Sequence, residues 1–257
     1  MPATAKFEAL ALPGLPMVKA GDDLAALLAD ALARCGEALR AGDVVVVAQK
    51  IVSKAEDRRV VLDDVVPSAR ALQIADETAK DPRLVELILS ESRRVVRKAP
   101  GVLIVEHRLG FVMANAGIDQ SNVGADDEPA AALLLPLDPD GSAERLRAGL
   151  GRLCGALPGI VINDSFGRPW RQGTMGIAIG AAGIPALLDK RGKTDLFGRP
   201  LRVTVIGLAD EIAAAASLLM GGADEGQPVV ILRGLDLGGE ALPASALVRP
   251  AEEDLFR

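Results

Sequence analysis

The sequence predicts an α+β fold, in which mixed, largely antiparallel sheets pack against helices. Apolar strand-like runs and amphipathic helical runs alternate irregularly along the chain, which argues against a doubly wound parallel sheet. Short apolar runs also cluster between residues 95 and 115, as the strands of consecutive hairpins do. The 257 residues suit one large unit, with two intimately packed subdomains as the alternative.

The amino-terminal half predicts three helices and one buried strand before the hairpins. Asp22 and Asp23 can cap a helix that begins at Leu24 and stops at Ala41 and Gly42. The β-branched run VVVVAQKI predicts a buried strand at residues 44–51. Two further helices are expected at residues 68–80 and 82–92, with a break at Pro82.

The remaining elements follow from the same periodicities. The acidic, proline-containing segment 126–139 predicts a surface loop with one apolar turn, and Ser142 is expected to cap the next helix. Residues 159–170 read as a buried strand that runs into a polar turn, and residues 251–257 as a mobile tail. The other expected elements are strands at 95–97, 102–107, 111–115, 175–180, 201–208 and 229–234, and a helix at 209–221.

Charge and composition exclude several classes of protein. The net charge of −6 and an aromatic content of 2% disfavour nucleic-acid binding and an anionic membrane surface. The amino terminus lacks a secretory leader, and the apolar runs are too short to span a bilayer. Cys35 and Cys154 lack CxxC spacing and are interpreted as a pair of buried thiols. A cytoplasmic location is therefore expected.

Several common site motifs are missing from the sequence. There is no GxxxxGK[ST] phosphate loop, and no GxGxxG follows a strand. A serine-hydrolase triad would have to use His107, the only histidine, but no GxSxG elbow is present. His107 ends an apolar strand and is interpreted as structural. A zinc site is disfavoured because the sequence has one histidine and two widely separated cysteines.

Two polar segments that follow apolar strands are candidate sites. After the VVVV run, Gln49, Lys50, Ser53 and Lys54 could hold phosphate oxygens, although a solvated strand end is the simpler interpretation. In residues 114–124, Asp119 and Asn122 could contribute oxygen ligands to Mg²⁺ or Mn²⁺, and an Asx turn is the alternative.

Two later segments carry comparable chemistry. In residues 162–173, Asp164 and Ser165 could be ligands of a hard cation, and Arg168 and Arg171 could neutralise phosphates. The cationic stretch 189–201 is either an ordinary surface loop or a loop that closes over an anionic substrate.

Taken in order, these segments resemble the F-420-0:γ-glutamyl ligase (coenzyme F-420:L-glutamate ligase) family. The resemblance covers roughly residues 10–235. It is carried by GDVVVVAQKIVSKAEDR, PGVLIVEHRLGFVMANAGIDQSNV, VINDSFGRPWRQGTMGIAIG, DKRGKTDLFGRPL and ADEIAAAASLLMGGADEGQPVVILRG.

The resemblance implies a GTP-dependent, amide-forming ligase, with residues 1–257 as one homodimeric catalytic unit. GTP would phosphorylate the carboxylate of the deazaflavin precursor F-420-0, and the amine of L-glutamate would displace the phosphate, with further γ-linked additions. Mg²⁺ or Mn²⁺ would offset the phosphate charge, and K⁺ is a further candidate cation. The alternatives are glutamylation of another carboxylate metabolite, or a non-catalytic protein that binds a nucleotide or a deazaflavin.

The resemblance also implies the site residues. It gives Asp119, Asp164 and Lys54 catalytic roles, and Asp119, Asp164 and Ser165 metal-site positions. Its nucleotide contacts are Leu15, Pro16, Met17, Val18, Gln49, Lys50, Lys54, Asn122, Met220, Gly221, Gly222, Ala223, Asp224, Glu225, Gly226 and Gln227. Some relatives carry a metal-binding Glu directly after the MG dipeptide, where this chain has Gly222. We expect Glu225 to replace that ligand, with Asp224 or a water molecule as alternatives.

Overall fold

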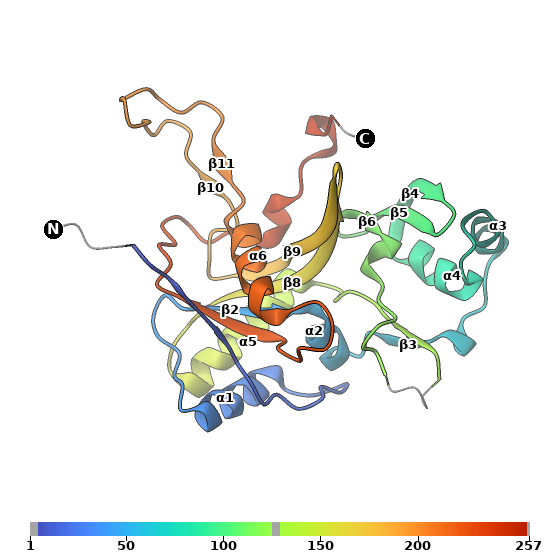
Figure 1. Cartoon of the computed structure of the whole chain (residues 1–257), viewed down its shortest axis with the longest axis horizontal. Coiled ribbons are helices and arrows are strands. Elements are labelled where there is room, and N and C mark those ends of the chain that lie inside the picture. Colours follow the sequence, from blue (N-terminus) through green and yellow to red (C-terminus); the bar gives the residue numbers. More distant parts are fainter. Residues whose placement is uncertain (1–4, 125–128, 256–257) are drawn as a thin grey trace.

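A computed structural model describes residues 5–124 and 129–255, and it confirms the α+β class. A five-stranded sheet with the order β1-β12-β2-β8-β9 forms its centre (Figure 1). These strands are β1 (Glu8–Ala11), β2 (Val44–Ala48), β8 (Gly159–Arg168), β9 (Arg171–Ala182) and β12 (Val229–Arg233). β2 and β8 are parallel, whereas the other pairs in this sheet are antiparallel.

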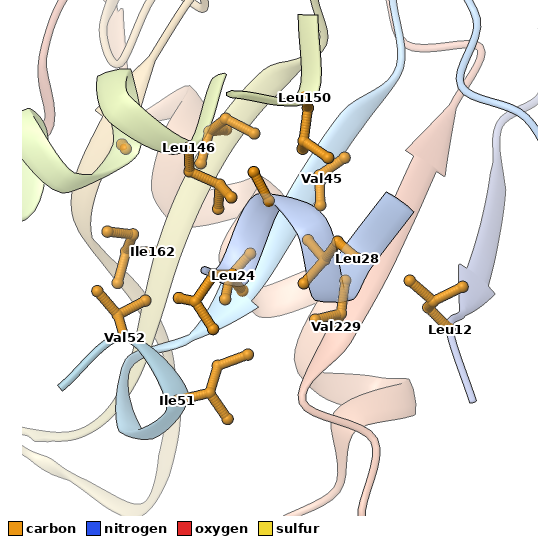
Figure 2. Packing of buried hydrophobic residues seen from close by; sticks show 14 of the residues in the cluster. Leu12, Leu24, Leu28, Val45, Ile51, Val52, Leu146, Leu150, Ile162 and Val229 are labelled. Carbon is orange, nitrogen blue, oxygen red and sulfur yellow. The ribbon is translucent and has the colours of Figure 1, made fainter. Parts of the chain in front are cut away.

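Alternation along the central strands creates two apolar faces, and each face is covered by helices. Val45, Ile160 and Ile162 face α1 (Leu24–Cys35) and α5 (Pro139–Cys154), as Figure 2 shows in part. Val46 and Val161 face α6 (Leu208–Met220) on the other side. The buried valine run therefore contributes side chains to the apolar clusters on both faces of the sheet, as expected of a central strand that has no solvent-exposed face.

A second lobe contains α3 (Ala69–Thr78), α4 (Pro82–Ser90) and the antiparallel strands β4 (Ser92–Ala99), β5 (Val102–His107) and β6 (Val112–Ala114). It has an apolar cluster of its own, which includes Ile74, Val85, Ile88 and Leu103. The hairpins predicted around residues 95–115 are confirmed in this lobe, and β8 and β9 form a further hairpin.

Short elements complete the chain. They are α2 (Gln49–Ala55), β3 (Arg59–Val61), β7 (Ala131–Leu133), β10 (Leu188–Asp189), β11 (Val205–Ile206), and 3-10 turns at Leu62–Asp64, Asn115–Gly117, Ala244–Leu247 and Ala251–Glu253. The β10–β11 hairpin projects from the body as an arm (Figure 1). No helix in the described ranges is long and apolar enough to cross a membrane.

The amino-terminal boundaries correct two predictions. The first helix ends at Cys35 because Gly36 adopts a left-handed conformation (φ 69°) that stops it before Ala41. The strand expected at 44–51 ends at Ala48, and the chain turns directly into α2. Cys35 is exposed at the end of its helix and Cys154 is half-buried, so the expectation of two buried thiols was wrong.

Later boundaries also differ from expectation. Asp138, rather than Ser142, caps α5, and Ser142 lies within the helix. Part of the loop expected at 126–139 is strand β7, although residues 126–128 lie outside the described ranges. Within 201–208 only Val205–Ile206 forms a strand. Mobility of the 251–257 tail stays a prediction; Phe256 and Arg257 lie outside the described ranges.

A buried ionic cluster of Arg58, Glu91, His107 and Arg108 joins the second lobe to the segment after α2. Glu91 accepts hydrogen bonds from Arg58 Nη2 at 3.0 Å and Arg108 Nε at 2.8 Å. His107 is fully buried, and its Nε2 lies 3.5 Å from a Glu91 oxygen, in agreement with a structural role. Burial alone would raise the pKa of Glu91, but contacts from His107 and Arg108 and the charge of Arg58 outweigh it and lower the pKa to about 2.

We expect Glu91→Gln to reduce the free energy of unfolding at pH 7 by about 3 kcal/mol, because two partly buried guanidinium groups lose their counter-charge. Since the folded-state pKa of Glu91 is depressed, its contribution is complete above about pH 4.5 and is lost as the pH falls towards 2. Urea unfolding at several pH values measures this. Glu144→Gln, in an exposed pair with Arg147, is the matched control and should change little. A Glu91→Gln effect that persisted unchanged at pH 2 would contradict the electrostatic account.

Candidate functional site

The candidate site lies where the parallel pairing of β2 with β8 ends. Ala48 pairs in register with Asn163 as the last pair of the two strands, so Lys50 and Asp164 both lie just beyond this carboxyl end. In sheets with parallel strands, this carboxyl edge is the usual position of ligand sites, because the strands fix the backbone while their ends stay accessible. The first and third candidate segments are thus brought together by one strand pairing.

Asp119 reaches this edge through a chain of pairings that begins directly after α2. Strand β3 pairs with β7, with Arg59 opposite Leu133. Asp119 in turn forms an isolated bridge with Leu133, exchanging backbone hydrogen bonds of 3.0 and 2.8 Å. Because α2 carries Lys50 and leads into β3, these pairings fix the position of Asp119 relative to Lys50.

Lys50 and Asp119 form an ion pair at the centre of the site. The Lys50 Nζ atom lies 3.0 Å from Asp119 Oδ2, and both side chains are 30% exposed. Nζ also lies 3.3 Å from the hydroxyl of Ser121 and 3.4 Å from its carbonyl oxygen. The lysine is therefore held by the acidic segment, so the interpretation of Lys50 as a solvated strand-end residue was wrong.

Asp164 completes a pair of carboxylates beside this lysine. Its pKa is raised to about 7, mainly by burial and also by the nearby charge of Asp119, which together outweigh a hydrogen bond from the Ser165 amide and the charge of Lys50. Two neighbouring carboxyl groups with like charge are a donor set that suits a hard divalent cation, which would relieve their repulsion. The chemistry of Asp119 and Asp164 therefore fits Mg²⁺ or Mn²⁺, and these two side chains would hold such an ion.

Ser165 lies on the opposite face of β8 from Asp164. It pairs with Gly176, whose open side faces Ser217 and the backbone of α6. Successive strand residues point to opposite faces, so the Ser165 hydroxyl is directed towards α6 rather than towards the carboxylate pair. Its role as a metal ligand stays a prediction, but one cation held between Asp119 and Asp164 would not meet it here.

Glu225, the proposed additional metal ligand, is hydrogen-bonded within its own loop. Its Oε2 accepts a 2.8 Å hydrogen bond from the Ala223 amide, and amides of its own loop lower its pKa. Among the described residues, no three His, Cys, Asp or Glu side chains are grouped to hold one metal ion. The structure thus does not bring Glu225 to Asp119 and Asp164, because the side chain folds back onto the loop around Gly221.

The predicted nucleotide-contacting segments do converge. Asn122 Nδ2 donates to the Ala223 carbonyl oxygen at 3.2 Å, which joins the acidic segment to the loop Met220–Gln227. The amino-terminal stretch passes the same region: Leu12 N bonds to Val229 O and Gly21 N to Ala55 O, both at 2.9 Å. Between these anchors, Val18 is buried, Leu15 is half-buried, and Pro16 and Met17 are exposed.

Three buried side-chain oxygens lie around this edge without a hydrogen bond in the described part of the chain. They belong to Gln49, Asn163 and Gln227. Gln49 Nε2 donates to Ser53 Oγ at 2.8 Å, so Ser53 is a buried partner of Gln49 and does not face a phosphate. Unpaired buried acceptors are costly unless a ligand supplies donors, which favours a ligand rich in N–H or O–H groups.

Lys54 is half-buried and lies one helical turn after Lys50, so the two residues share one side of α2. Arg168 is instead turned to the Gly173 carbonyl in the β8–β9 hairpin. The cationic stretch 189–201 lies in the projecting arm, where Asp189 pairs with Arg191. Sequence reasoning did not single out Ser121 or Asn163 as site residues, although both directly adjoin residues that it did select.

The fold and the site together define an α+β protein with a carboxylate pair and a lysine at the carboxyl edge of a parallel strand pair. Residues 14–234 match the model of the F420-0:Gamma-glutamyl ligase family. The chain is 48% identical over 253 residues to the coenzyme F420:L-glutamate ligase of Methanothermobacter thermautotrophicus, covering 96% of this chain and 98% of that protein.

Two further relatives carry the same name. The Methanopyrus kandleri protein is 46% identical over 93% of both chains. The Archaeoglobus fulgidus protein is 44% identical over 98% of this chain and 97% of its own length. The chain therefore belongs to the F420-0:γ-glutamyl ligase family and is a ligase.

We expect Asp164→Asn to stabilise the metal-free protein by on the order of 1 kcal/mol, because the amide removes a desolvated charge that opposes Asp119. Asparagine retains an oxygen that can accept the Ser165 amide, so the local geometry should persist. Thermal unfolding in chelator-treated buffer measures the shift, and Asp30→Asn, at an exposed position of α1, is the control. A lower melting temperature for Asp164→Asn would show that the carboxylate is not under electrostatic strain.

Proposed function

We propose that this ligase joins L-glutamate to F420-0 in a GTP-dependent reaction that passes through an acyl phosphate. The observation that carries the proposal is the meeting of Lys50, Asp119 and Asp164 at one sheet edge, in a chain 48% identical to a coenzyme F420:L-glutamate ligase. Ligation of this kind brings several anions together, so it needs both fixed cations and carboxylates that can bind a metal ion.

The proposed chemistry has two balanced steps. A carboxylate oxygen of the acceptor attacks the γ-phosphorus of GTP, the bond to the β-phosphate oxygen breaks, and GDP leaves. The glutamate amine then attacks the acyl carbon, loses a proton, and expels inorganic phosphate as the amide forms. Repetition at the γ-carboxylate of the added glutamate would extend the chain by further γ-linked residues.

Lys50 and the two aspartates have separate tasks in this scheme. The Lys50 ammonium, already held by Asp119 and Ser121, neutralises phosphate oxygens at a fixed position. Lys54, one turn later, adds a second cation on the same side of α2. Asp119 and Asp164 would hold Mg²⁺ or Mn²⁺, which supplies charge neutralisation to the phosphates when bound.

The other end of the nucleotide would lie against Gln49, Asn122 and the Met220–Gln227 loop. The unpaired oxygens of Gln49 and Gln227 require donors, and a guanine base offers N–H groups on its pyrimidine edge. The hydrogen bond between Asn122 and Ala223 closes this region against the acidic segment. These features support a nucleotide whose phosphates point from the loop towards Lys50.

The activity is tested by the mass of the product. Incubation of the chain with F420-0, L-glutamate, GTP and Mg²⁺ or Mn²⁺ should give species heavier by whole glutamyl residues, with one GDP formed per addition. Omission of GTP, glutamate or metal should abolish the mass gain, and Asp119→Asn should slow it about a hundredfold. Glutamylation only of a different carboxylate, or tight binding of GTP without turnover, would replace this proposal by one of its two alternatives.

We also propose that two chains associate through the arm between β10 and β11. Leu196 is 99% exposed and Phe197 86% exposed near its tip, where isolated chains would present apolar surface to water. Burial of such side chains against a second copy would remove this cost.

We therefore expect Leu196→Glu combined with Phe197→Glu to convert a dimer to a monomer. Light scattering coupled to size exclusion measures the mass. Leu255→Glu changes an equally exposed leucine outside the arm and should leave the mass unaltered. A dimer that survived the double substitution would place the interface elsewhere.

A further inference from the structure

A cavity lined by residues of both lobes lies along strand β8, the strand that carries Asp164. Its volume is about 260 Å³, and it lies between the β5–β6 turn, the β8–β9 hairpin and the carboxyl-terminal segment. Most of its walls are apolar. They are formed by Gly110, Phe111, Val112, Phe166, Ile177, Ala178, Leu247 and Val248, with Asp210, Arg249 and Asp254 as the charged members.

Strand register places this cavity beside Asp164. Ile177, in its wall, is the cross-strand partner of Asp164. Phe166, also in its wall, lies two residues after Asp164 on β8 and therefore on the same face. A ligand seated against Ile177 and Phe166 thus extends naturally to the carboxylate that we assign to the reaction centre.

The cavity is preformed by an aromatic contact between the two lobes. The rings of Phe111 and Phe166 lie 5.8 Å apart at 85°, an edge-to-face arrangement. The backbone of Gly110 approaches Val248 so closely that a Cβ atom there would lie 2.9 Å from Val248 Cγ1. Phe111, Phe166 and Ile177 nevertheless remain half-exposed, so their apolar surface is available to a ligand.

Charge decides which substrate fits. Free glutamate carries two carboxylates, and GTP carries several phosphate charges, but the charged lining comprises two carboxyl groups and one guanidinium. A flat, largely apolar ring system matches the walls better. Asp210 accepts the Ala178 amide with Oδ1 at 2.9 Å, and Oδ2 can accept a hydrogen bond from a ring N–H. Arg249, exposed at the edge, has no ion pair within the described ranges and can meet an anionic substituent.

We infer that this cavity binds the planar deazaflavin ring of the acceptor, with Phe111, Phe166 and Val248 as its walls and Asp210 as a polar anchor. The inference rests on the proposed function, because it takes the acceptor to be a deazaflavin. A volume of about 260 Å³ lies just below the range of about 300–1,000 Å³ for drug-sized ligands, so the cavity holds the ring and not the whole acceptor. The acid-bearing end then lies towards Asp164.

The test separates ring binding from ligation. The probe is a deazaflavin fragment that lacks the acceptor carboxylate, titrated into the full chain without GTP or metal and followed by the fluorescence of the ring. Val248→Trp and Val112→Trp fill the cavity from two different elements. Val112 is 40% exposed, so its replacement should be tolerated by the fold even if Val248→Trp is not. Leu255→Trp, in the same terminal segment but outside the cavity, is the matched control, and melting temperatures establish that each variant is folded.

We expect the parent and Leu255→Trp to bind the fragment equally and each folded cavity variant to bind it at least about tenfold more weakly. In ligation assays, the KM for F420-0 should rise by a similar factor while the KM for GTP stays constant. Unaltered fragment binding in Val112→Trp, or absence of binding to the parent, would overturn the inference. If the parent ligates glutamate but the cavity variants bind the fragment normally, the ring site alone is wrong. If the parent binds the ring but ligates nothing, the proposed function is wrong and the ring site stands.

Discussion

The parallel pairing of β2 with β8 is the constraint on which the rest of the structure depends. Val44 to Ala48 are matched with Gly159 to Asn163, so residues more than a hundred positions apart in the sequence meet where this pairing ends. All four valines are buried because α1 and α5 cover one face and α6 the other. The apolar layers fix this strand pairing, and the pairing sets the positions of Lys50 in α2 and Asp164 in β8 relative to each other.

The site is built from charges that the fold holds in a partly desolvated position. Lys50 balances Asp119 at 3.0 Å, but Asp164 is left with a raised pKa of about 7. Such an arrangement costs stability, which the large core behind it offsets, and a cation placed beside the two carboxyl groups would relieve their repulsion. The buried cluster around Glu91 is the opposite case, because its cations outnumber the carboxylate and depress its pKa. The carboxyl groups of Asp119 and Asp164 therefore favour a bound cation, whereas the cluster around Glu91 only joins the two lobes.

Much of the fold could be predicted because it depends on local periodicity. The valine run, the helices broken at Pro82 and the hairpins after residue 92 are confirmed, with errors mostly at their ends. The misplaced ends have specific causes. Gln49 begins α2 although it directly follows the last residue of a strand. Asp138 caps α5 because its side chain accepts a hydrogen bond from the Gly141 amide three residues later. The polar site residues could be nominated because each follows an apolar run, whereas Ser121 and Asn163 gain their roles only from neighbours in space.

The sequence by itself determined the α+β class, the family, and the identity of Lys50, Asp119 and Asp164 as residues of interest. The tertiary structure alone decided which of the nominated residues meet. It joined Lys50 to Asp119 and Asn122 to Ala223, turned Ser165 to the other face of β8, and folded Glu225 back onto its own loop. It also formed the cavity between Phe111 and Phe166 from segments that have no relation in the sequence. The physical reason is that strand alternation, register and long-range burial set the direction of a side chain, and none of these is encoded within a short window of residues.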